Sequence, residues 1–193
     1  MNPYGQGQWQ QQGGGAPSLF GALPSASPSA SAAIQADSVT FQFVNFKSTI
    51  LNSSIIGPQQ RTLYRVVTEA TAPACTVLKD NESRSAAMVQ WQPNATVEVR
   101  SIAAQQRVRD WLRLSSDQSR RVMEVNGVKY AWAPMQGFIC MYKVNTSTPR
   151  VLCRIARVPN SVTLELSQEA MQLSLLEPAL VATVLLSSGA SID

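Results

Sequence analysis

Short apolar runs separated by turn residues fill most of the chain, and no long helical pattern interrupts them. Residues 121–133 form two alternating runs around Asn126-Gly127, the residue pair preferred in the type I′ turn of a β-hairpin. About ten strands within about 130 residues favour an antiparallel sandwich or barrel over βαβ units. The runs are residues 40–46, 61–69, 76–78, 87–91, 96–102, 121–133, 138–144, 150–158 and 162–166.

The pattern changes at Ser167, a residue type that caps helices. After it the apolar residues cover most of the helix circumference, which is typical of a helix surrounded by protein or by lipid. The apolar stretch 173–186 is shorter than a membrane-spanning helix and contains Glu177 and Pro178. We therefore expect a helix over 167–188 that the strands bury, with Pro178 kinking it or starting a second segment. Insertion into a membrane is the alternative.

A set of mostly aromatic and apolar residues lies along these predicted strands and before the predicted helix. They are Leu63-Tyr64-Arg65-Val66 with Thr68, Val89-Gln90-Trp91, Val108, Asp110-Trp111-Leu112, Gly127, Tyr130, Trp132, Ile155-Ala156 and residues 164–167 before the helix. On these positions, residues 40–190 resemble an uncharacterised fungal domain family near the tubby C-terminal-like superfamily, which includes LURP-one-related proteins and phospholipid scramblases. The resemblance implies a barrel of about twelve strands around a central C-terminal helix. It also implies relatives that bind phosphoinositides or other membrane lipids, and it supplies no catalytic motif.

The expected fold is mainly β: an antiparallel tubby-like β-barrel of about ten to twelve strands that encloses the hydrophobic C-terminal helix. Residues 37–193 form this domain. Residues 1–36 contain no charged side chain, and 28 of the 36 are Gly, Pro, Gln, Ser or Ala. Such a composition predicts a disordered tail. The tail is either a solvated tether or a weakly adhesive segment acting through Tyr4 and Trp9.

The residue types exclude several kinds of chemistry. The chain has no histidine, which removes Ser-His-Asp and Cys-His catalysis and every zinc site that contains histidine. Cys75, Cys140 and Cys153 are widely spaced and odd in number, so they support no disulfide framework. The acidic residues are too dispersed for a carboxylate dyad or a metal cage. We expect a non-enzymatic, cytoplasmic module without a cofactor or a metal, and without a transmembrane span.

Positive charge is concentrated in one block. Residues 100–157 hold eleven basic and three acidic side chains, whereas residues 158–193 hold four acidic and no basic ones. If residues 107–113 form a strand, their three arginines and one tryptophan share a face that suits phosphate groups at a membrane surface. If they form a helical turn, the tryptophan points inward and the arginines are only solvated. The candidate lipid-binding or anion-binding residues are Arg107, Arg109, Trp111, Arg113, Arg120, Arg121 and Lys129.

Two hypotheses about function follow. The first is peripheral binding of anionic membrane lipid through the basic and aromatic residues. The second is a protein-interaction or assembly module whose tail binds protein partners. Nucleic acid is a weaker candidate because the sequence contains no DNA-binding or RNA-binding motif. An enzyme acting on a small ligand would need a cleft with converging ionisable groups.

Overall fold

A computed structural model of the chain describes residues 33–34, 36–47, 49–69 and 74–193. Nearly all of the predicted tail, including Tyr4 and Trp9, lies outside the described residues. No helix among the described residues combines the length and hydrophobicity that a bilayer-spanning segment requires.

Among the described residues, thirteen strands form one antiparallel sheet, so the expectation of a mainly antiparallel β-fold is confirmed. The strand order is β7-β6-β5-β4-β3-β2-β1-β13-β12-β11-β10-β9-β8. The strands are β1 Val39–Val44, β2 Ser53–Ile56, β3 Thr62–Glu69, β4 Cys75–Asp80, β5 Ser85–Gln90, β6 Thr96–Val99, β7 Ala103–Arg107, β8 Arg113–Leu114, β9 Arg121–Val125, β10 Val128–Met135, β11 Phe138–Lys143, β12 Val151–Val158 and β13 Ser161–Leu166.

Alternation along each strand explains which side faces inward. In β1, Phe41 and Phe43 are buried while Gln42 between them is exposed. The hairpin between β9 and β10 has the expected two-residue loop, and both Asn126 and Gly127 have positive φ angles, of 51° and 77°. These are the backbone conformations that a type I′ turn requires. The prediction of this hairpin is confirmed.

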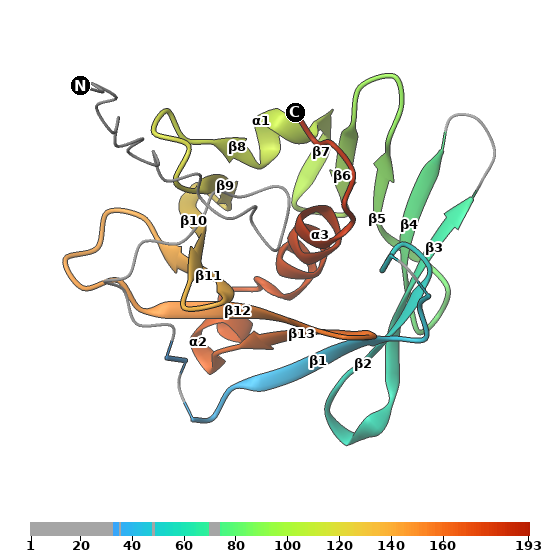
Figure 1. Ribbon diagram of the computed structural model, residues 1–193, viewed down its shortest axis with the longest axis horizontal. Helices are drawn as coiled ribbons and strands as arrows, with labels where there is room; N and C mark the ends of the chain where they lie inside the picture. The colour runs from blue at the N-terminus through green and yellow to red at the C-terminus, as the bar shows by residue number, and fades with distance from the viewer. Residues whose placement is uncertain (1–32, 35, 48, 70–73) are drawn as a thin grey trace, which may run out of the picture.

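The helical segments are the 3₁₀ turn Pro58–Gln60 and the helices α1 Val108–Trp111, α2 Gln168–Gln172 and α3 Leu176–Ser187. Figure 1 shows α3 in the middle of the molecule with the strands curving around it. Every residue from Pro178 to Ser187 is buried. The buried hydroxyl of Thr183 donates to the carbonyl oxygen of Ala179 at 2.7 Å, so this polar group keeps a partner in the core.

The helix expected over 167–188 is divided into two helices, α2 and α3. Ser167 caps α2 by accepting a hydrogen bond from the backbone nitrogen of Ala170 at 3.1 Å. Ser174 then has a positive φ of 57°, which interrupts the helix. Pro178 lies in the first turn of α3, where its missing N–H has no intrahelical acceptor to lose. We expected Pro178 either to kink the helix or to start a second segment, and the structure shows the second arrangement.

Among the strands that the structure describes, hydrogen bonds do not close the sheet into a barrel. Strands β7 and β8 are the two ends of the strand order, and α1 connects them along the chain (Figure 1). The strand considered for residues 107–113 is therefore wrong. The backbone nitrogen of Leu112 donates to the carbonyl of Val108 at 2.8 Å, and this helical turn buries Val108, Trp111 and Leu112 together. Burial of three apolar side chains outweighs β-pairing at this position.

Truncating the central helix provides a test of its role. Leu185 is fully buried, so we expect Leu185→Ala to lower the free energy of unfolding by about 2–5 kcal/mol. Leu173, at 39% exposure, is the matched control. Leu173→Ala should change the free energy of unfolding by less than about 0.5 kcal/mol. Urea unfolding followed by tryptophan fluorescence measures both. Equal effects of the two variants would contradict a central role for α3.

Candidate anion-binding surface

Three of the predicted arginines lie on and beside α1. Arg107 ends β7 and precedes α1, Arg109 lies within α1, and Arg113 begins β8. All three side chains are exposed. Within the part of the chain that the structure describes, none of the three forms an ion pair with a carboxylate. The acidic side chain nearest in sequence is Asp110, which is itself exposed.

Trp111 does not share this surface. The helical turn directs it inward, and only 4% of it is exposed. The interleaved face of arginines and tryptophan expected from a strand is therefore absent. Trp111 contributes apolar area to the core instead of an aromatic contact at a membrane interface.

Arg121 is also inside the protein, with 2% exposure. Its Nη1 donates to the carbonyl oxygen of Leu112 at 3.1 Å and to Oδ1 of Asp193 at 2.9 Å, and its Nη2 donates to Oδ2 of Asp193 at 2.5 Å. These hydrogen bonds hold Asp193 against β9 and hold β9 against the end of α1. They also lower the pKa of the Asp193 carboxyl group. The predicted surface role of Arg121 is corrected to a structural one.

Arg120 is half-buried and lies directly before β9. Arg113 lies opposite Val122 in β9. Val122 lies opposite Ala131 in β10, and Ala131 lies opposite Tyr142 in β11. A side-chain hydrogen bond joins Arg120 to Tyr142 and raises the pKa of Arg120. Arg113 and Tyr142 therefore lie in one outward row of side chains, and Arg120, two residues before Val122, lies beside that row on the same face.

Two further charged side chains of this part of the chain are Lys129 and Asp117. Lys129 is exposed on β10 and lies directly opposite Glu124 of β9. Asp117, in the turn between β8 and β9, accepts hydrogen bonds from the Ser115 hydroxyl at 2.6 Å and from the backbone nitrogen of Ser119 at 3.1 Å. These bonds lower the pKa of Asp117 to about 2, so its carboxylate is charged at neutral pH. We define the basic surface as Arg107, Arg109, Arg113 and Arg120.

Tyr142 is the member of this region that the sequence analysis missed. Its sequence neighbours, Met141 and Lys143, gave no reason to group it with Arg120. Only the register of β9, β10 and β11 brings the two side chains together. The alternation in residues 138–144 was a signal that Tyr142 faces outward, but no sequence signal identified its partner.

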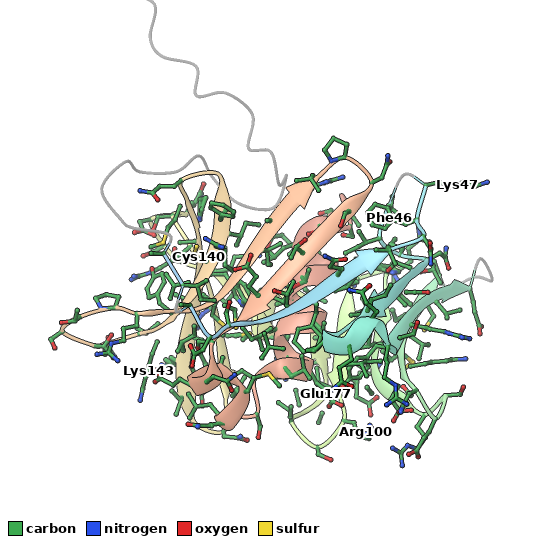
Figure 2. All side chains as sticks on the ribbon, turned by 90° about the horizontal axis from the view of Figure 1, so that it is seen from below. Phe46, Lys47, Arg100, Cys140, Lys143 and Glu177 are labelled. Atoms are coloured by element: carbon green, nitrogen blue, oxygen red, sulfur yellow. The ribbon has the colours of Figure 1, made fainter. Side chains whose placement is uncertain are left out.

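A second charged cluster lies where α3 begins. Arg100 is 3.4 Å from Asp80 and 3.7 Å from Glu177, and Arg84 is 3.0 Å from Asp80. Figure 2 shows Arg100 and Glu177 together at one edge of the molecule. Burial, the Glu177 and Asp80 charges and a hydrogen bond to Glu177 raise the pKa of Tyr64 to about 12. Because the carboxylates here pair with guanidiniums, the cluster fastens the central helix to the sheet.

The cysteines are free thiols. Burial raises the pKa of Cys140 to about 12 and raises the pKa of Cys153 well above its ordinary value. Such thiols are poor nucleophiles because the reactive form is the thiolate. Among the described residues, no three Cys, Asp or Glu side chains gather in a way that would hold a metal ion.

Comparisons with known proteins give a family without an assigned activity. A family model described as a family of unknown function, DUF6593, matches residues 48–187. A solved structure of a protein from Arabidopsis thaliana is similar with a TM-score of 0.42 and 11% sequence identity, covering 76% of this chain and 91% of that chain. No curated protein matches.

The buried guanidinium of Arg121 generates a prediction about pH. Asp193→Asn removes the charge that compensates Arg121, and we expect it to lower the free energy of unfolding at pH 7 by about 1–3 kcal/mol. The pKa of Asp193 is lower in the folded protein than in the unfolded chain. Its contribution is therefore full above the unfolded value of about 3.9 and is lost as the pH falls through the folded value. Urea unfolding at several pH values should show wild type and variant converging below about pH 4.

Asp110→Asn is the control, because Asp110 is exposed and forms no ion pair within the described ranges. A constant difference between Asp193→Asn and wild type from pH 7 to pH 3 would contradict the assignment.

Proposed function

The chain belongs to DUF6593, a family of unknown function, and we propose that it is a non-enzymatic module that binds anionic phospholipid headgroups through the basic surface. The observation that carries the proposal is the group of exposed guanidiniums at Arg107, Arg109 and Arg113, for which the described residues supply no carboxylate partner. Guanidinium groups bind phosphate oxygens with two parallel hydrogen bonds.

The inward position of Trp111 decides what kind of membrane contact this surface can make. Without an exposed aromatic side chain on α1, binding rests on charge rather than on insertion into the interface. Each arginine near an anionic bilayer contributes about 1 kcal/mol, and salt screens this attraction within about 10 Å. The interaction should therefore weaken strongly as the salt concentration rises.

The proposal extends to ancestry and location. A central apolar C-terminal helix enclosed by antiparallel strands supports grouping this domain with the tubby C-terminal-like superfamily and with its fungal relatives. The same proposal is that the protein is cytoplasmic and associates peripherally with membranes. The lack of histidine and the burial of Cys140 and Cys153 support the absence of an enzymatic activity.

The second candidate is a protein-interaction module that acts through the tail. The composition of residues 1–36, uncharged and rich in Gln, Gly, Pro, Ser and Ala, favours weak adhesive contacts. Deletion of residues 1–36 should then reduce self-association in analytical ultracentrifugation. Identical sedimentation of the full and shortened chains would remove this candidate.

Charge reversal tests the lipid proposal. In co-sedimentation with phosphatidylserine-containing vesicles, Arg109→Glu with Arg113→Glu should weaken binding of the full chain by at least about tenfold. Wild-type binding should require the anionic lipid and should fall between low and moderate salt. Thermal unfolding of each variant checks that it is folded.

The matched control is Arg61→Glu with Arg65→Glu, which reverses two exposed arginines at β3 on another part of the sheet. It changes the net charge by the same amount. Equal loss of binding in both double variants would attribute binding to net charge alone. Unchanged binding in Arg109→Glu with Arg113→Glu would refute the proposed surface.

A further inference from the structure

The outer face of β10, β11 and β12 carries a small apolar cluster that is separate from the main core. Cys140 and Val151 are the buried members, at 0% and 9% exposure. Met141, the chain neighbour of Cys140, belongs to the main core, so Cys140 faces the opposite side of the sheet. Cys140 lies opposite Arg154 in β12, whose side chain is partly exposed. A thiol that points outward and yet is fully buried must be covered by other side chains.

The covering side chains come from two places. Met135 and Phe138 flank the turn between β10 and β11, and Ile34 comes from the segment that precedes β1. Ile34 is thus the member of this cluster that is distant in sequence. Figure 2 places Cys140 at the other end of the sheet from Phe46 and Lys47, which follow β1. The segment before β1 and the loop after it therefore lie at opposite ends of the molecule.

Polar contacts hold the rim of this cluster. The guanidinium carbon of Arg154 lies 4.5 Å from the centre of the Phe138 ring, and Nη2 of Arg154 is 2.7 Å from Oε2 of Glu165. The cation–π contact and the ion pair fix the ring beside Cys140. The amide of Gln168 in α2 donates to the carbonyl oxygen of Asp37 at 3.1 Å. The segment around Ile34 is therefore attached at both its apolar contact and its junction with β1.

We propose that the outer face of β10–β12 is a docking site for a segment bearing one aliphatic side chain, and that its occupant is this chain's own Ile34. The site offers an apolar floor of Cys140 and Val151, a wall of Phe138 and Met135, and a polar rim. A segment of the same chemistry can enter only where Ile34 is displaced. This inference is independent of the basic surface and of lipid binding.

The thiol of Cys140 reports on the occupancy of the site. In the full chain with Cys75→Ser, Ile34→Asp should uncover Cys140 and accelerate its reaction with a disulfide reagent by about tenfold or more, the ratio that losing one buried isoleucine contact predicts. Cys153, which faces the core, should stay unreactive and so reports on global unfolding. Mass spectrometry of the labelled peptides distinguishes the two cysteines.

A peptide added in trans separates docking from simple loosening of the fold. A synthetic peptide of residues 30–38, added to the Ile34→Asp chain, should slow the labelling of Cys140 again, whereas the same peptide with Asp at the isoleucine position should not. Leu173→Asp, at an exposed apolar residue elsewhere, is the control and should leave labelling unchanged. Equal labelling of wild type and Ile34→Asp, or no protection by the peptide, would overturn the proposal.

Discussion

The helix α3 imposes the constraint on which the rest of the structure depends. A helix with apolar side chains on every face satisfies its own backbone hydrogen bonds but leaves no side that water can solvate well. Strands must therefore enclose it, and each strand must present one apolar face inward. Phe41 and Phe43 in β1, the middle strand of the sheet, meet this requirement, and so do Met123 and Val125 in β9, near one end of the strand order.

The sequence predicted those features of the fold that local periodicity determines. Short apolar runs of three to nine residues identified most strands, and Asn126-Gly127 identified a hairpin because its φ angles are a local property. For residues 107–113 the sequence left both a strand and a helical turn open, because apolar residues at 108, 111 and 112 fit a helical turn as well as the arginines fit a strand face. The structure has the helical turn. Whether the sheet closes into a barrel depends on whether its two end strands, β7 and β8, pair with each other. This is a long-range property that no local sequence pattern predicts.

The sequence predicted which residues make the candidate site basic, but it did not predict how their side chains are arranged or which of them are buried. Clustering of basic residues in the sequence found Arg107, Arg109 and Arg113, which are indeed exposed. It also included Arg121, whose carboxylate partner Asp193 lies 72 residues away and could not be inferred. A buried arginine and a solvated one look alike in a sequence, because the difference lies in a distant partner that compensates the charge.

The place of α3 in the chain has a consequence for biosynthesis. All thirteen described strands precede α3, so they leave the ribosome before the element that fills the space between them. Until then their apolar faces have no permanent partner, and the growing chain resembles a partly folded intermediate with exposed strand edges. Such a domain cannot complete its folding before α3 has emerged. Until then its strands depend on chaperones, or on the rapid emergence of α3, to avoid pairing with other molecules.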